Sequence, residues 1–177
     1  MEYQYYDYNS LISSDDRTAT CDNVKNLIKN GNYWTNSPKY QTNINVFGQS
    51  GAHWMKLKMS FITSAFSFLG KEVKIKGIQS WAFLTSLEYP EDRDMLWHNH
   101  NHNTSVESVS GIYYVKVPVT DLECGTEFAP DGPTEESRLI LPPKEGQWLI
   151  YNSKEWHRPG ILKSNEPRII VAADLMY

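Results

Sequence analysis

The spacing of apolar residues changes at Gly70, and this change divides the chain into a helical first part and a strand-rich second part. Apolar positions recur with the period of an α-helix in Cys21–Lys29, directly after the potential capping residues Ser13–Asp16. They recur in the same way in Ala52–Leu69, which can present one apolar stripe. We therefore predict two helices, ended by Gly31 and Gly70.

After Gly70 the apolar residues come in short runs rich in β-branched and aromatic side chains, which is typical of strands separated by Pro and Gly turns. The predicted strands are Val73–Lys76, Ser80–Leu87, Ile112–Val117, Arg138–Leu141, Gln147–Tyr151 and Arg168–Ala172. A further short strand is predicted at Ile44–Phe47, and Gly125–Gly132 is predicted to be a loop between strands. Two helices followed by such strands predict an α+β, mainly β fold, in which the helices support one sheet of a sandwich or barrel.

The length of 177 residues predicts a single domain with a sizeable core. We expect residues 1–70 to form a helical and strand support, and residues 71–177 to form the β core. Within the support, residues 1–50 are expected to complete the sheet or to cover one of its edges.

Composition and charge exclude several classes of protein. The apolar fraction of 40% is that of a folded chain, and the net charge of −4 comes without a basic stripe, which argues against a nucleic-acid partner. No apolar run approaches 18 residues and the start Met1–Tyr6 lacks the features of a signal peptide, so we expect no membrane partner. Cys21 and Cys124 lie far apart and predict no disulfide framework. A cytoplasmic location is the expectation, in the host cytoplasm if the protein is viral.

Histidines are concentrated in two places. His98, His100 and His102 alternate along the chain, and His157 follows near the C-terminus. In a strand, alternate side chains project from the same face, so these imidazoles can meet one another and a remote fourth. Neutral imidazole is the commonest metal ligand, and a His-x-His pair with a remote His predicts an open, three-ligand metal site. The alternative is a solvated loop that happens to be rich in His and Asn.

The order and spacing of three segments resemble those of a known family. The segments are His98–His100 followed by Ser110–Val115, Pro142–Ser153 running into Trp156-His157, and Arg168–Val171. Together they resemble the iron(II)- and 2-oxoglutarate-dependent oxygenases, most closely the small prolyl-hydroxylase-like proteins of marine bacteria and their phages. The resemblance extends from about Gly77 to the C-terminus. It implies a double-stranded β-helix, also called a jelly roll, of the cupin-like type.

The resemblance also implies an activity and a set of site residues. The activity would be hydroxylation of an amino-acid or peptidyl side chain, such as that of proline, with Fe(II) as cofactor, 2-oxoglutarate and dioxygen as co-substrates, and succinate and CO2 as products. The substrate would be a small molecule or a peptide. By position, His98, His100 and His157 would bind the metal, and Arg168 and Tyr114 would bind the distal carboxylate of 2-oxoglutarate.

One position departs from the family pattern. Family members usually carry Asp or Glu two residues after the first His ligand, whereas His100 occupies that position here. A His-x-His variant occurs among the prolyl-hydroxylase-like proteins, so the departure is compatible with the resemblance. Two alternatives stay open: the pair could be His100 and His102, and Glu107 could supply the carboxylate.

Two other functions compete with the oxygenase hypothesis. A cupin-like metalloprotein of another reaction class would also use a His-x-His pair, but usually with a Gly-rich run and a nearer Glu. A non-catalytic jelly-roll module for sugar or protein would contain the histidines incidentally and would bind no metal.

Overall fold

The main sheet of the computed structural model contains five antiparallel strands in the spatial order β1-β6-β3-β8-β2. The structure describes residues 1–34, 40–86, 96–100 and 106–177. The strands of this sheet are β1 (Tyr3–Asp7), β2 (Gly77–Thr85), β3 (Ser108–Lys116), β6 (Gln147–Asn152) and β8 (Arg168–Met176). β1 lies at the edge and pairs with β6, so the N-terminal part completes the sheet as predicted.

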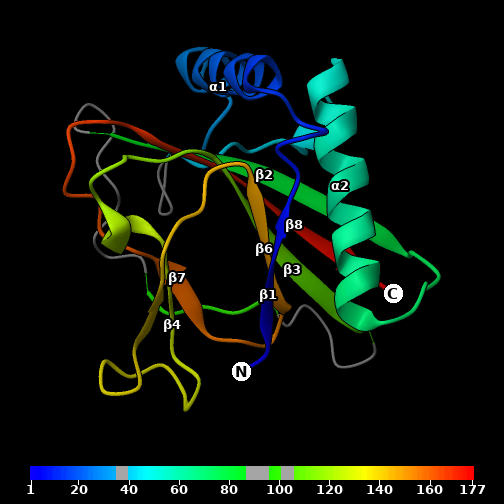
Figure 1. The fold of residues 1–177 in the computed structure, drawn as a ribbon, viewed down its shortest axis with the longest axis vertical. Coiled ribbons are helices and arrows are strands. Elements are labelled where there is room, and N and C mark those ends of the chain that lie inside the picture. Colours follow the sequence, from blue (N-terminus) through cyan, green and yellow to red (C-terminus); the bar gives the residue numbers. More distant parts are fainter. Residues whose placement is uncertain (35–39, 87–95, 101–105) are drawn as a thin grey trace.

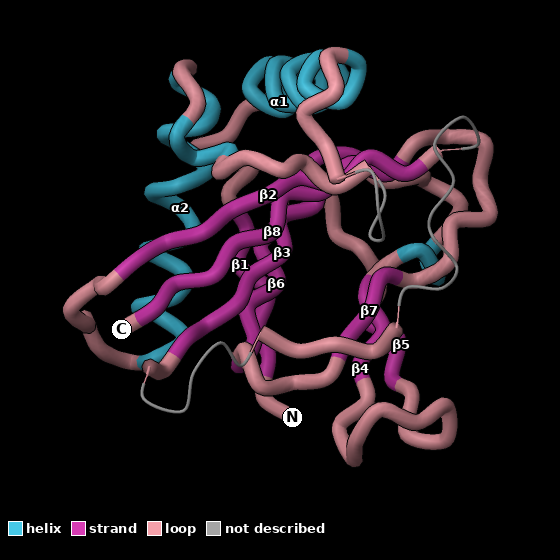
Figure 2. Tube along the Cα trace, turned by 180° about the vertical axis from the view of Figure 1, so that it is seen from behind, coloured by secondary structure: helices cyan, strands magenta, loops and turns pink. Residues whose placement is uncertain are grey.

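A second, smaller sheet faces the first. Its strands are β4 (Thr126–Phe128), β5 (Leu139–Leu141) and β7 (His157–Pro159), in the order β5-β4-β7. The two sheets lie side by side in both views, with one helix on the far side of the main sheet and the other above it (Figures 1 and 2). This arrangement of two antiparallel sheets is that of a double-stranded β-helix, as predicted.

Helices α1 (Ser14–Lys29) and α2 (Ala52–Leu69) are the two predicted helices. α1 begins earlier than predicted because Ser13 and Asp16 form a capping box: the Ser13 hydroxyl accepts from the Asp16 amide, and the Asp16 carboxylate accepts from the Ser13 amide. α2 ends at Gly70, whose φ of 65° is the left-handed conformation that glycine adopts without strain.

Side-chain alternation divides the interior into two clusters, one on each face of the main sheet. Tyr113 of β3 points towards the helices and packs, with Trp148 and Phe61, in the larger cluster. Its neighbour Tyr114 points to the opposite face and belongs to the cluster between the two sheets. One face of the main sheet thus packs against the helices, and the opposite face is directed towards the small sheet and the candidate site.

Three of the predicted elements differ from the structure. Val73–Lys76 is not a strand. The neighbouring strand β8 ends at Met176, which pairs with Gly77 and accepts a hydrogen bond from Lys76 N at 2.8 Å, so no strand remains beside the residues before Lys76. Ile44–Phe47 is not a strand either: the Asn45 side chain caps the short 3-10 helix η1 (Val46–Gly48) and so competes with strand pairing.

The predicted loop Gly125–Gly132 contains a strand. Thr126–Phe128 is the middle strand of the small sheet, and all three of its residues are buried. A three-residue strand that is covered on both sides shows too little alternation to be recognised in the sequence.

Candidate metal centre

Three histidines from two distant segments meet between the sheets. His98 and His100 lie on the segment 96–100, and His157 begins β7. One ring nitrogen of each lies within 4.8 Å of those of the other two, and among the described residues they form the group that could hold a metal ion. Backbone hydrogen bonds between His98 and His157 bring the two segments together.

The Nδ1 atom of each imidazole is engaged by the protein. His98 Nδ1 lies 3.2 Å from the Leu96 carbonyl oxygen, and His157 Nδ1 lies 3.0 Å from that of Glu155. His100 Nδ1 lies 2.8 Å from the Asp174 carboxylate. Because these oxygens accept hydrogen bonds, they favour the tautomer with hydrogen on Nδ1, which leaves Nε2 for a metal.

The protonation state of two of these histidines also suits metal binding. Burial, and then the neighbouring His100, lower the pKa of His98 from 6.5 to about 4. Burial lowers the pKa of His157 well below 6.5, and the two neighbouring histidines add to this effect. His98 and His157 are therefore neutral at neutral pH, which is the form that binds a metal.

Two alternatives from the sequence have different outcomes. His102 lies outside the described residues. Glu107 lies on the surface and is not part of the group of three. His98 and His100 lie in the described segment 96–100. In that segment His98 forms an isolated bridge to His157, not a continuous strand.

A cavity of about 480 Å³, including its open mouth, lies beside the histidines. Its walls come from the inner faces of both sheets and are largely apolar and aromatic. The lining residues outside the triad include Trp81, Phe83, Ile112, Tyr151, Ile170 and Ala172.

Arg168 is the buried cation of this cavity. It is 2% exposed, and its Nη1 donates to the carbonyl oxygens of Cys124 and Gly160, the latter at 2.7 Å. A Cβ on residue 160 would overlap the backbone carbonyl of Glu123. Only glycine therefore allows the backbone at 160 to lie this close to the backbone of Glu123. The carbonyls hold the guanidinium in a fixed orientation at the wall of the cavity.

Tyr114 lies on the same side of the cavity as Arg168. Its hydroxyl is 2.8 Å from Thr126 Oγ1, and burial raises its pKa to about 12. The hydroxyl therefore stays protonated and can donate a hydrogen bond. On the other side, the Tyr151 hydroxyl lies 3.1 Å from His157 Nε2, the atom that a metal would take.

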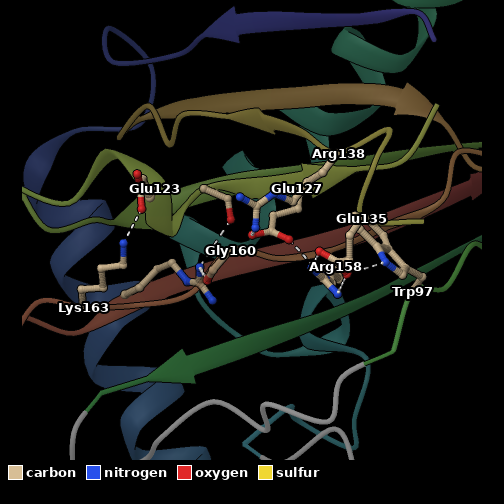
Figure 3. A network of polar contacts seen from close by, with 10 residues as sticks. Trp97, Glu123, Glu127, Glu135, Arg138, Arg158, Gly160 and Lys163 are labelled. Carbon is tan, nitrogen blue, oxygen red and sulfur yellow. Dashed lines mark hydrogen bonds and ion pairs between the residues drawn. The ribbon is translucent and has the colours of Figure 1, made fainter. Parts of the chain in front are cut away.

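An ion-pair cluster joins the two His segments at the edge of the cavity (Figure 3). Arg158 follows His157 and donates to the buried Glu127 at 2.7 Å and to Glu135 at 2.8 Å. Its guanidinium also lies 4.2 Å above the ring of Trp97, which precedes His98. The cluster therefore fixes the neighbours of two candidate ligands.

Several site residues were not predicted from the sequence, namely Asp174, Ser110, Ser153, Thr126, Tyr151 and Arg158. One of them had a signal. Asp174 is, besides Arg168, a charged residue in an apolar strand, and it is in phase with Arg168, Ile170 and Ala172. A charge on the inner face of a buried strand indicates a partner inside the protein. The others are common residue types without a distinctive pattern.

Comparison with known proteins supports the fold. No protein-family model matches the chain, and a comparison with curated proteins finds no significant match. Among solved structures, the chain is similar to the non-heme alpha ketoglutarate dependent epimerase SnoN from nogalamycin biosynthesis, with 13% identity, a TM-score of 0.70, and coverage of 98% of this chain and 77% of that chain.

Two prolyl hydroxylases are also similar. One is from Trichoplax adhaerens, in complex with a hypoxia inducible factor peptide fragment, with 18% identity, a TM-score of 0.63, and coverage of 98% and 82% of the two chains. The other is a Pseudomonas putida prolyl-4-hydroxylase, with 10% identity, a TM-score of 0.65, and coverage of 98% and 91%. At these identities the likeness establishes the double-stranded β-helix fold. No helix among the described residues is long and apolar enough to cross a membrane.

Proposed function

We propose that the protein is a non-haem Fe(II)- and 2-oxoglutarate-dependent dioxygenase that hydroxylates an amino-acid or peptidyl side chain, with proline as a candidate, and releases succinate and CO2. The observation that carries the proposal is one cavity lined both by three convergent histidines and by a buried arginine. A metal site alone does not require that cation, whereas a metal-chelating dicarboxylate does.

The residues present fit both the metal and the co-substrate. His98, His100 and His157 would hold Fe(II) as a three-ligand set that leaves coordination positions for other ligands. When bound, Fe(II) and 2-oxoglutarate would supply the activation of dioxygen coupled to decarboxylation of the keto acid. Arg168 and Tyr114 would bind and orient the distal carboxylate of 2-oxoglutarate through charge-assisted hydrogen bonds.

The remaining wall residues would control access and orientation. Trp81, Phe83 and Ile170 line the cavity with apolar surface, which excludes water and strengthens the electrostatic contacts within it. Solved structures with the same fold support this proposal, since they include an alpha ketoglutarate dependent epimerase and prolyl hydroxylases. The assignment to the marine bacterial and phage type, and to the cytoplasm, stays a prediction from the motifs.

The decisive experiment is an anaerobic titration of the Fe(II)-loaded protein with 2-oxoglutarate, followed by visible absorption. Chelation of the keto acid gives a weak metal-to-ligand charge-transfer band. We expect the band in the wild type, no band in His157→Ala, and a band that needs far more 2-oxoglutarate in Arg168→Met. His102→Ala should keep the band, whereas His100→Ala should lose it.

The outcomes separate the three hypotheses. Metal binding without the band would contradict the oxygenase proposal and favour a cupin-like metalloprotein. Failure to bind metal at all would favour a non-catalytic jelly-roll module. A band that survives His100→Ala but not His102→Ala would instead move the second ligand to His102.

A further inference from the structure

We propose that Asp174 is a positioning residue that supplies, through His100, the negative charge that the ligand set itself lacks. The inference rests on the metal site of the proposed function, but not on the keto acid or on the substrate. His100 occupies the position at which a carboxylate would bind the metal directly. The carboxylate of Asp174 does not reach the metal position itself but is hydrogen-bonded to the His100 imidazole.

The geometry of this pair is specific. Asp174 lies on β8 with no exposed surface, and its Oδ1 is 2.8 Å from His100 Nδ1. Ser110 is its direct cross-strand partner on β3, and the Ser110 hydroxyl donates to the same Oδ1 at 2.6 Å. The Ser110 hydroxyl also lies 3.0 Å from that of Ser153. The carboxylate is thus held from the adjacent strand while it faces the imidazole.

The backbone of His100 is fixed by the same group of residues. Its amide donates to the Ser153 carbonyl at 2.8 Å, and its ring packs edge-on against Trp81 at 5.2 Å between centroids. With amide, ring face and Nδ1 all fixed, the orientation of Nε2 is set before any metal arrives. Such prior orientation reduces the cost of assembling the site.

Asp174 determines which nitrogen of His100 carries the hydrogen. A carboxylate only accepts hydrogen bonds, so the hydrogen of the His100–Asp174 contact lies on Nδ1. The Nε2 lone pair is then available on the side where His98 and His157 lie, at ring-centroid distances of 5.4 and 4.9 Å. A histidine held by a carboxylate is also a more basic ligand.

The three imidazoles differ in the charge of their partners. His98 and His157 place Nδ1 against the neutral carbonyls of Leu96 and Glu155, whereas His100 places it against a carboxylate. A dication bound by three neutral ligands away from water is poorly compensated. A buried carboxylate one imidazole away compensates part of that charge. Asp174 therefore provides, beyond His100, the negative charge that the three histidine ligands do not provide.

The test compares two substitutions that separate charge from hydrogen bonding. Asp174→Asn keeps the close oxygen acceptor for Nδ1–H but removes the charge. Asp174→Ala removes both and leaves only the more distant Ser110 hydroxyl, 3.3 Å from Nδ1. Asp121→Asn is the matched control: Asp121 is a buried carboxylate that accepts from the backbone amides of Lys163 and Ser164, away from the histidines. The measurements are the dissociation constant of Co(II) and the imidazole ¹⁵N NMR spectrum, neither of which requires turnover.

We expect Co(II) binding to weaken about 10- to 100-fold in Asp174→Asn, the range found when such partners of metal ligands are removed. Binding should weaken further in Asp174→Ala, and Asp121→Asn should match the wild type. The NMR spectrum of the metal-free wild type should show His100 with hydrogen on Nδ1. This tautomer should persist in Asp174→Asn and become mixed in Asp174→Ala.

Three results would overturn the inference. The first is Co(II) affinity in Asp174→Asn within twofold of the wild type, which would leave the proposed function intact. The second is an equal loss in Asp121→Asn, which would show a general effect on the fold. The third is His100 of the wild type with hydrogen on Nε2, a result that needs no variant and so holds even if a substitution prevents folding. A wild type that binds no Co(II) would overturn both proposals.

Discussion

The backbones of His98 and His157 pair directly with each other. The His98 amide donates to the His157 carbonyl at 3.1 Å, and the His157 amide donates to the His98 carbonyl at 2.8 Å. These bonds involve no side chain and no metal, yet they place two candidate ligands with ring centroids 4.4 Å apart. The site is therefore organised by the fold itself, unlike small metal domains that fold only around their ion.

His157→Ala should accordingly abolish metal binding without unfolding the protein. The backbone bridge survives, while the buried ring and its bond to Tyr151 are lost, so the free energy of unfolding should fall by about 1–2 kcal/mol. Metal affinity, measured by calorimetry with Fe(II) or Mn(II), should fall by at least about 100-fold. His53→Ala is the control, since His53 lies on α2 and outside the triad. Equal metal binding by both variants would exclude His157 as a ligand.

The adjacent tyrosines of β3 provide a second prediction. Tyr114→Phe removes a hydroxyl from the cavity side, and Tyr113→Phe removes one from the helix side. If Tyr114 donates to the carboxylate of 2-oxoglutarate, its loss should weaken keto-acid binding about 5- to 10-fold, the equivalent of one hydrogen bond. Tyr113→Phe should leave that affinity unchanged. The check is calorimetric titration of the metal-loaded variants, and identical values would exclude the role of Tyr114.

The sequence predicted the parts of this site that depend on pattern. Residue type and alternation along 96–100 indicated the histidines, and the period of two in a strand places Tyr114 on the face opposite to its neighbour Tyr113. Helix α2 was predicted with its exact bounds, because an apolar stripe and a terminal glycine coincide at Gly70. Local pattern was sufficient in each of these cases.

Features that depend on pairing across the chain could not be predicted in the same way. The small sheet consists of three-residue strands, and β7 exists only because β4 lies beside it. Asp174 acquires its role from Ser110 and His100, which are remote in sequence. One residue cannot reveal such partners, although a charged side chain in phase with the apolar residues of a strand indicates that a partner exists.

The buried histidines predict how stability depends on pH in the metal-free protein. The pKa of His98 is about 4 in the fold because of burial and of His100, against about 6.5 in an unfolded chain. Burial lowers the pKa of His157 in the same direction. Between these values the unfolded state binds more protons than the folded state. The free energy of unfolding should therefore fall as pH decreases below about 6.5, by up to about 1.4 kcal/mol per pH unit for each histidine.

Urea unfolding with a chelator at pH 7.5, 6.5 and 5.5 measures this slope. The stability should change little between pH 7.5 and 6.5 and decrease between 6.5 and 5.5. His98→Gln, which cannot titrate, should reduce the lower slope, whereas His53→Gln should reduce it less because His53 is less buried and its pKa is less strongly lowered. A slope that is identical in the wild type and His98→Gln would show that His98 is not held neutral by the fold.

The ion pair between Glu127 and Arg158 links stability to the metal centre. Glu127 is buried, and its carboxylate accepts from Arg158 at 2.7 Å, with Arg138 at 3.5 Å on its other oxygen. Arg158→Met keeps the packing of the side-chain stem but leaves this buried charge with the more distant arginine. The free energy of unfolding should fall by roughly 2 kcal/mol. Metal affinity should fall severalfold as well, because Trp97, next to His98, loses the guanidinium on its ring.

A double-mutant cycle distinguishes this explanation from a simple loss of packing. If the cost of Arg158→Met comes from an uncompensated carboxylate, the same substitution in a Glu127→Gln background should cost much less, because no buried charge remains. If the cost comes from packing, it should be the same in both backgrounds. Glu135→Gln is the matched control, since Glu135 pairs with the same guanidinium but is largely exposed to solvent, which screens the interaction. A coupling between Arg158 and Glu127 that is no larger than that between Arg158 and Glu135 would contradict the electrostatic account.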